Sequence, residues 1–236
     1  MFSPTSDSQT KSFNPSKFLF GIFFIALAFR LWGVTNPLLD FHGWRQALSA
    51  TFAYNFYVDG MNFFNPRPSM INSIFHFEFP LYTYLVALLY KVFGFHEILG
   101  RIVAIGFSMG SIWFLYLLGK RYFDKKTALV ACGFYAVLPF SVYYSRTFMP
   151  ESTMLFFSIS MVYMFARWLD TGKWSHFLLA SLLATLAFLV KLPTLYMGGP
   201  LLLLAWSKYR GQIFYQPLLY IFVALILAPP ALWYSY

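Results

Sequence analysis

The sequence predicts an all-α, polytopic membrane protein with seven transmembrane helices and two juxtamembrane helices in a large first external loop. Of its 236 residues, 59% are hydrophobic and only 11% are charged, whereas soluble domains carry about 25% charged residues. A water-soluble domain of this composition would expose a largely apolar surface, so composition excludes that class together with disordered and collagen-like chains. The aromatic content of 23% suits lipid-facing helices with interfacial aromatic belts.

Seven segments come close to the length of about 20 apolar residues that a membrane-spanning helix needs. They cover roughly 18–34, 100–118, 127–144, 150–168, 175–190, 193–206 and 214–234. The first could be read as a signal peptide, because Ala26-Leu27-Ala28 imitates a cleavage site, but apolar sequence continues to Val34 and favours an uncleaved anchor. We therefore expect residues 1–16 to form a disordered cytoplasmic tail and residues 17–236 to form the membrane module.

An eighth apolar run, Leu81–Tyr90, is too short to span easily and is expected to lie along the membrane surface. With an internal N-terminus, seven spans place ten of the 17 Lys and Arg residues inside and seven outside, as the positive-inside rule requires. Eight spans with an external N-terminus would give eleven inside and six outside. The charge count alone does not exclude eight spans. That alternative, however, requires the shortest segment to cross the bilayer. The net charge of +9 is thus explained by loop charges, and no basic cluster indicates nucleic-acid binding.

The first external loop, residues 35–99, is expected to form a platform at the membrane surface. Residues 43–58 place Trp44, Leu48, Phe52 and Phe56 at a spacing of four, which predicts a surface helix with an apolar stripe. A second surface helix is predicted over 81–93, after a turn-rich stretch that contains prolines.

Three acidic residues of the external side are the candidate catalytic groups. Asp40 follows the first span, Glu78 lies among Phe and His side chains before the second surface helix, and Glu151 begins the fourth span. A carboxylate in such apolar surroundings is partly desolvated, and this favours a general base. Glu151 also has a structural interpretation, because an acid in the first turn of a helix is stabilised by the helix dipole.

Other polar and aromatic residues on the same side are candidates for substrate binding, namely Arg45, Arg146, Lys191, His42 and Trp44. Arg146 can equally be an interfacial anchor, and Lys191 can extend its ammonium group to the membrane surface from the end of a span. The spacing of Asp40, His42, Glu78 and Glu151 matches no zinc motif. A divalent cation remains an option, and no other cofactor is indicated.

The chain resembles the polyprenyl-phosphate-sugar-dependent glycosyltransferases of the C-type superfold, near the protein O-mannosyltransferase and lipid A aminoarabinose transferase group. The motifs that carry the resemblance, after the acid at position 40, are Glu78-Phe79-Pro80-Leu81-Tyr82, Gly94-Phe95, Gly100-Arg101, Gly119-Lys120-Arg121-Tyr122-Phe123, Tyr144-Ser145-Arg146 with Pro150-Glu151, and Val190-Lys191-Leu192-Pro193. The chain departs from the family pattern at Phe41, where an Asp-Glu pair is usual, and at Glu78-Phe79-Pro80, where relatives often have Lys-Pro-Pro. Members are usually longer, so we expect this chain to be the N-terminal part of a longer protein.

The resemblance implies transfer of a sugar from a polyprenyl-phosphate carrier to a hydroxyl group of a lipid, glycan or protein acceptor. It implies that Asp40 is the catalytic base and Glu151 a second external acid. It also implies a bacterial inner membrane with the active site on the periplasmic side. The alternatives are a translocator of lipid-linked sugars and a non-catalytic membrane subunit. Transport predicts ionisable residues at mid-membrane and paired broken helices, whereas the external acids of this chain gather at one interface.

Overall fold

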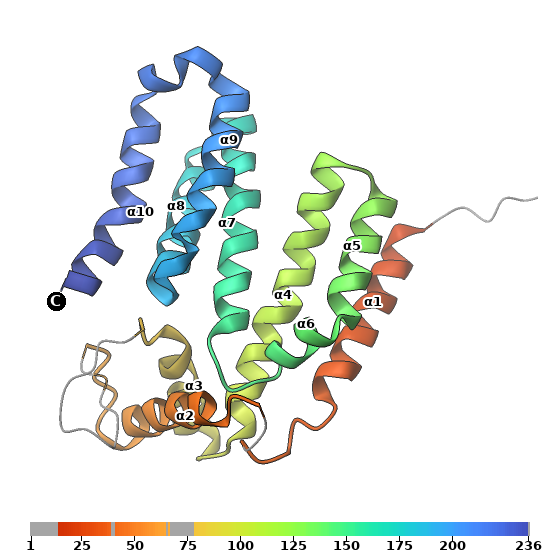
Figure 1. Ribbon diagram of the computed structural model, residues 1–236, viewed down its shortest axis with the longest axis vertical. Helices are drawn as coiled ribbons and strands as arrows, with labels where there is room; N and C mark the ends of the chain where they lie inside the picture. Colours follow the sequence, from red (N-terminus) through yellow and green to blue (C-terminus); the bar gives the residue numbers. More distant parts are fainter. Residues whose placement is uncertain (1–13, 39–40, 65, 67–77, 236) are drawn as a thin grey trace, which may run out of the picture.

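The computed structural model describes residues 14–38, 41–64, 66 and 78–235, and every regular element in this part of the chain is a helix (Figure 1). The elements are α1 (Pro15–Leu31), α2 (Gly43–Val58), α3 (Leu81–Phe93), α4 (Ile98–Tyr122), α5 (Lys125–Val137), α6 (Pro139–Tyr144), α7 (Glu151–Thr171), α8 (Trp174–Val190), η1 (Leu192–Met197), α9 (Gly198–Tyr209), η2 (Arg210–Tyr215) and α10 (Pro217–Ser235). Helix α1 begins inside the predicted tail, because Asn14 caps it by accepting a hydrogen bond from the Ser16 amide.

The long helices stand side by side in two groups that meet between α4 and α7 (Figure 1). Helices α1, α4 and α5 form one group, and α7, α8, α9 and α10 form the other. Helices α2 and α3 pack against each other and lie across one end of this arrangement, next to the turns that lead into α7 and out of α8. Chain segments far apart in sequence therefore meet at that end.

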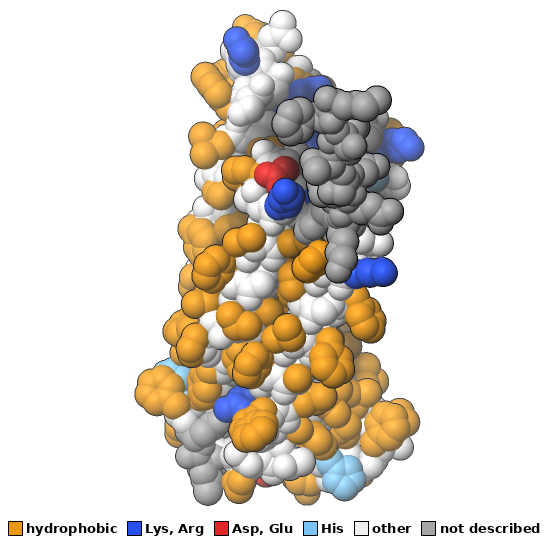
Figure 2. All heavy atoms as spheres, turned by 90° about the vertical axis from the view of Figure 1, so that its right-hand side faces the viewer, with side chains coloured by type: hydrophobic (Ala, Val, Ile, Leu, Met, Phe, Trp, Pro, Cys, Tyr) orange, Lys and Arg blue, Asp and Glu red, His pale blue; other side chains and the backbone are white. Residues whose placement is uncertain are grey.

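The predicted all-α class is confirmed, and among the described residues three helices are long and apolar enough to cross a membrane: α4, α7 and α10. Helices α3 and α8 are apolar but shorter. The seven-span count stays a prediction. Hydrophobic side chains cover the middle of the face drawn in Figure 2, and most of its charged side chains lie towards the upper part of the view. Large apolar residues such as Phe20 and Leu203 are exposed, as lipid-facing positions require.

Two predicted spans are interrupted, and proline explains the first break. The segment 127–144 was expected to be continuous, but α5 ends at Val137 and α6 begins at Pro139, which has no N–H to donate to the preceding turn. The segment 193–206 begins as the 3₁₀-helix η1, and its α-helix starts only at Gly198.

Helices α2 and α3 have the bounds predicted for the two surface helices, 43–58 and 81–93, and their place at the membrane surface stays a prediction. The stripe predicted for α2 is only partly correct, because its buried positions are Gln46, Ala53 and Phe56, whereas Trp44 is 75% exposed. The first residue before α2, His42, has a φ of 61°, a left-handed conformation that directs the chain into the helix.

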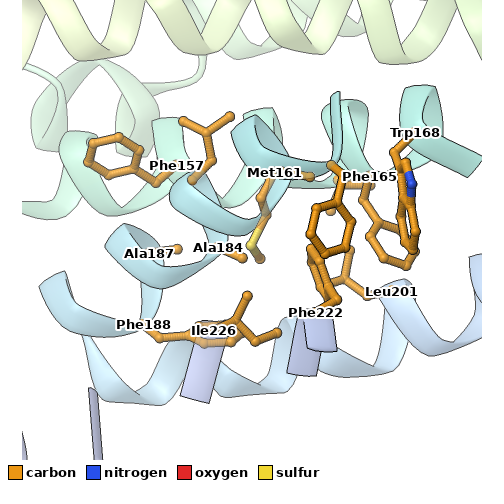
Figure 3. Packing of buried hydrophobic residues seen from close by; sticks show 14 of the residues in the cluster. Phe157, Met161, Phe165, Trp168, Ala184, Ala187, Phe188, Leu201, Phe222 and Ile226 are labelled. Atoms are coloured by element: carbon orange, nitrogen blue, oxygen red, sulfur yellow. The ribbon is translucent and has the colours of Figure 1, made fainter. Parts of the chain in front are cut away.

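The largest core cluster joins α7 to α8, α9 and α10 (Figure 3). Bulky residues of α7 recur every three or four positions, including Phe157, Met161, Phe165 and Trp168. They pack against small residues of α8, such as Ala184 and Ala187. Small side chains let two helices approach closely within a bilayer, where packing rather than water exclusion holds them together.

A glycine on α4 provides a test of a second core cluster, in which Phe148 packs with residues of α3 and α4. A Cβ atom at Gly100 would lie 2.2–2.5 Å from three ring carbons of Phe148, whose side chain is fully buried. We expect Gly100→Ala to lower the thermal unfolding midpoint in detergent, because overpacking costs about 1–3 kcal/mol. Gly106→Ala on the same helix is the matched control, since its Cβ would meet no atom within 4 Å. An equal or higher midpoint for Gly100→Ala would contradict the close α4–Phe148 contact.

Candidate functional site

Four ionisable side chains from separate segments meet at the end of the molecule where α2 and α3 lie. Lys191 Nζ donates to Glu151 Oε1 at 2.6 Å, and Arg45 Nη1 lies 3.3 Å from the same oxygen. Arg45 Nη2 lies 3.5 Å from Glu78 Oε1. The result is an alternating chain, Lys191–Glu151–Arg45–Glu78, which we call the charged cluster. Two cations balance two carboxylates in it.

The charged cluster is shielded from solvent to different degrees along its length. The side chains of Glu151 and Lys191 are 14% and 16% exposed, whereas those of Glu78 and Arg45 are 28% and 36% exposed. Burial raises the pKa of Glu78 above its ordinary value, and the negative charge of Glu151 acts in the same direction. The positive charges of Lys191 and Arg45 oppose this rise in the Glu78 pKa without cancelling it.

One carboxylate oxygen of the charged cluster has no partner in the part of the chain that the structure describes. Glu151 Oε2 is buried and accepts no hydrogen bond from any residue that the structure describes. A buried oxygen of this kind costs free energy unless a donor fills it. A hydroxyl group of a bound substrate could donate the missing hydrogen bond to this oxygen.

The segment that precedes Glu151 is held rigidly between α2, α3 and α4. Phe148 and Met149 are fully buried, and the Phe148 amide donates to Gln46 Oε1 at 3.0 Å. At the next turn, Ser152 Oγ donates to the Tyr144 carbonyl oxygen. Gln46 follows Arg45 in the sequence, so α2 both contacts the Glu151 carboxylate and fixes the backbone in front of it. Sequence analysis missed Gln46, because a neutral residue on a surface helix carries no signal.

Lys191 is positioned by the end of α8. It is the C-cap residue of that helix, and its amide donates to the Ala187 carbonyl oxygen at 3.2 Å. The fully buried Thr194 donates its hydroxyl to the carbonyl oxygens of Lys191 and Ala187, at 2.7 and 2.9 Å. The turn into η1 therefore sets the point from which the lysine reaches Glu151.

Two cavities meet at Arg45. The first, of about 270 Å³, lies between α2 and the start of α3, and Trp44, Glu78 and Tyr82 contribute to its lining. The second, of about 490 Å³, lies between α6 and α7 and is bordered by Glu151. Its wall combines the hydroxyl-bearing residues Tyr135, Ser141, Tyr144, Ser145 and Ser152 with the apolar residues Leu138, Phe140, Met154 and Leu155. Each cavity thus joins apolar surface to one side of the charged cluster.

The other predicted site residues lie apart from the charged cluster or outside the described residues. Asp40 falls in the second group, so its role stays a prediction. His42 Nε2 lies 3.1 Å from the Tyr144 hydroxyl, beside the second cavity. Arg146 donates to the Trp32 carbonyl oxygen, a contact that suits the anchoring alternative.

Arg101 of α4, which the sequence analysis named only as part of a motif, has a structural role. Its guanidinium donates to the carbonyl oxygens of Val34 at 2.7 Å and Pro37 at 3.3 Å. These carbonyls belong to the connection between α1 and α2, so Arg101 holds the chain on its way from the first helix to the platform.

In the described residues no group of three His, Cys, Asp or Glu side chains is close enough to hold a metal ion. Glu78 and Glu151 are the two carboxylates of the charged cluster, and each is paired with a cation. This part of the chain therefore adds no support for the option of a divalent cation.

The fold and the site together define an all-helical membrane protein with a charged site at one end of its helices. A family model described as dolichyl-phosphate-mannose-protein mannosyltransferase matches residues 78–234, and the chain belongs to this family. Its class is that of mannosyltransferase-like membrane glycosyltransferases that use a lipid-phosphate-sugar donor. Glu78, Glu151 and Lys191 lie within the matched residues, whereas Arg45 lies before them. Searches of the curated proteins and of the solved structures found no match.

The Lys191–Glu151 contact predicts a pairwise effect on stability. Lys191→Met leaves a poorly exposed Glu151 with Arg45 as its only described cation, and losing one partner of a buried pair costs on the order of 3 kcal/mol. Adding Glu151→Gln should restore much of the loss in unfolding free energy, because the remaining charge is removed too. Lys208→Met, at an exposed position of α9, is the control. Additive losses in the double variant would show that the two side chains are not coupled.

The raised pKa of Glu78 predicts a pH dependence. The folded protein binds this proton more tightly than the unfolded chain does, so the Glu78 contribution to stability is greatest below the ordinary pKa of 4.5. It declines as pH rises through the folded-state pKa, because the carboxylate must then ionise in a partly buried place. We expect Glu78→Gln to reduce this decline in unfolding midpoint, measured in detergent between about pH 4 and pH 7. Identical pH profiles for the two proteins would contradict the raised pKa.

Proposed function

We propose that this protein transfers a sugar from a polyprenyl-phosphate carrier to an acceptor hydroxyl at the external face of the membrane. The observation that carries the proposal is the charged cluster, which places two cations and a carboxylate oxygen without a described partner between two cavities. Family membership supports the reaction class and the lipid-phosphate donor. The acceptor hydroxyl belongs to a lipid, a glycan or a protein.

The chemistry needs a base for the acceptor and positive charge for the leaving group. The base removes the proton from the acceptor hydroxyl, whose oxygen attacks the anomeric carbon of the sugar from the face opposite the phosphate. The bond between the anomeric carbon and the phosphate oxygen breaks, and the polyprenyl phosphate leaves with the electron pair. We assign the proton transfer to Asp40, as the resemblance implies, and the orientation of the acceptor hydroxyl to Glu151 Oε2.

Lys191 and Arg45 supply the positive charge in this proposal. Both contact the same oxygen of Glu151, so their charged groups are close enough to act on one phosphate. Arg45 adds a planar group that can bind two phosphate oxygens at once. Preorganised donors of this kind stabilise a developing anion by about 3–4 kcal/mol each.

The raised pKa of Glu78 fits the binding of an anion. With Glu78 ionised, the charged cluster is neutral; with Glu78 protonated, it carries one net positive charge and attracts a lipid phosphate more strongly. Trp44 and His42 complete the proposed site, Trp44 in the wall of the first cavity and His42 through its contact with Tyr144 at the second.

The external placement of the site rests on charge. Basic residues gather at the end opposite the charged cluster, in the turns that connect α4 to α5, α7 to α8, and α9 to α10 and in the helix ends beside these turns (Figure 1). These residues are Lys120, Arg121, Lys125, Lys126, Arg167, Lys173, Lys208 and Arg210. By the positive-inside rule that end faces the cytoplasm. The seven-span topology puts the charged cluster outside, on the periplasmic side if the membrane is a bacterial inner membrane.

Neutralising the acidic residues should lower the rate of sugar transfer while the protein still binds the donor. We expect Asp40→Asn to lower transfer of labelled mannose from polyprenyl-phosphate mannose by about 10²–10⁴-fold, the usual contribution of a general base. Glu151→Gln should lower the turnover number more than it weakens donor binding, because the acceptor loses its orienting oxygen. The assay uses membranes that contain the full chain, with endogenous acceptors present.

Asp59→Asn is the control, since Asp59 ends α2 and forms no ion pair with any described residue. Near-normal transfer by folded Asp40→Asn and Glu151→Gln proteins would remove both acids from the reaction. A protein that binds the donor but shows no transfer in any membrane would favour the translocator or the non-catalytic subunit.

A further inference from the structure

We propose that Arg30 of α1 is a positioning residue: its guanidinium replaces the backbone N–H that Pro139 lacks, and so fixes the turn from α5 into α6 that leads the chain to Glu151. The proposal deepens the proposed function, since it names a residue that acts on the same site through the backbone.

Arg30 is fully buried and every one of its donors is used. Its Nε donates to Ser108 Oγ at 2.8 Å. Its Nη1 donates to the carbonyl oxygens of Ala26 and Ala136 at 3.0 and 3.1 Å. Its Nη2 donates to the Tyr135 carbonyl oxygen and to Ser141 Oγ, both at 3.3 Å. A guanidinium has five N–H groups, so Arg30 has none left for a ligand.

The proline explains why two of these acceptors are backbone carbonyls near the end of α5. In a continuous helix the amide of residue 139 would bind the Tyr135 carbonyl oxygen, but Pro139 has no N–H. The chain leaves the helical conformation at Leu138, with φ −56° and ψ 125°, and α5 ends. Carbonyl oxygens within an apolar segment need donors from the protein, because lipid supplies none.

The same carbonyls make the buried charge tolerable. The C-terminal end of a helix carries partial negative charge, so a cation is favoured there. All described contacts of Arg30 are to neutral oxygens or to the Tyr135 ring, whose centroid lies 5.3 Å from the guanidinium carbon. The arrangement is that of a cross-link between α1, α4, α5 and α6 rather than of a transport site.

The cross-link reaches the functional site through hydroxyl groups. Ser108 accepts from Arg30 and donates to Ser145 Oγ at 2.9 Å. Ser141 and Ser145 line the 490 Å³ cavity that Glu151 borders, whereas Arg30 itself is sealed from it. Ser145 begins the short segment that ends at Glu151. A change at Arg30 therefore alters the direction of α6, the wall of the cavity and the starting point of α7.

The test uses the full chain in detergent and compares Arg30→Met, Pro139→Ala and the double variant. Arg30→Met should lower the unfolding midpoint, because two carbonyls lose their donors. Pro139→Ala supplies an amide for the Tyr135 carbonyl, so it should restore at least half of that shift in the Arg30→Met background. Pro229→Ala, a proline inside α10, is the matched control and should restore nothing.

Activity should respond differently from stability. Arg30→Met should lower the turnover number by on the order of 10²-fold with little change in donor KM, the loss that a shift of about 1 Å produces at a reacting centre. The double variant should regain stability but not turnover, because a continuous α5–α6 helix leads the chain in another direction. Arg30→Lys, which keeps the charge and three donors, should retain more of both.

The proposal would be overturned if the shifts in unfolding midpoint caused by the two substitutions were additive. A folded Arg30→Met protein with full turnover would also overturn it. If Arg30→Met does not fold, the Arg30→Lys protein with and without Pro139→Ala answers the same question. Failure of the proposed function is distinguishable: absence of transfer by the wild type leaves the coupling in unfolding midpoints measurable, and that coupling alone then decides whether Arg30 replaces the missing amide.

Discussion

The site depends on one carboxylate oxygen that two cations share. Glu151 Oε1 binds Lys191 from the end of α8 and lies beside Arg45 from α2. Lys191 lies in a turn of the second helix group and Arg45 lies in α2, so the contact ties these two parts of the molecule together. It also leaves Glu151 Oε2 buried without a described partner. The free energy of that unfilled acceptor is recovered only when a donor binds.

Four arginines, Arg30, Arg45, Arg101 and Arg146, serve two different purposes. Arg45 faces carboxylates at the open junction of two cavities, where a charge can act on a ligand. Arg30, Arg101 and Arg146 instead donate to backbone carbonyls at points where the chain turns out of a helix. A turn at the apolar end of a helix leaves carbonyl oxygens without partners, and a guanidinium supplies several donors in one plane. The sequence alone does not distinguish these two uses of arginine. The hydrogen-bond and ion-pair partners in the structure do.

The sequence predicted those features that depend on apolar pattern and on charge near a boundary. The bounds of α2 and α3 and the gathering of Arg45, Glu78, Glu151 and Lys191 at one end followed from hydropathy, length and sidedness. The break at Pro139 was missed because apolar residues continue through it and hydropathy does not register a lost hydrogen bond. Gln46 and Arg30 were missed because the contacts that define their roles join them to backbone atoms more than 100 residues away, and no pattern of side chains in the sequence records such contacts. Asp40 and the seven-span count remain predictions.

Glu78 stands in the segment where relatives often have a lysine, and its position beside Arg45 shows how this difference affects the charge of the site. A lysine in this segment, as relatives often have, would add a permanent positive charge beside Arg45. Glu78 gives the same place an adjustable charge, because partial burial raises its pKa and brings protonation closer to neutral pH. When it is protonated, the remaining charges of Lys191, Arg45 and Glu151 sum to one positive charge, which is the sign that a departing phosphate needs. A carboxylate in this segment is therefore compatible with a phosphate-binding role that a lysine would fill more directly.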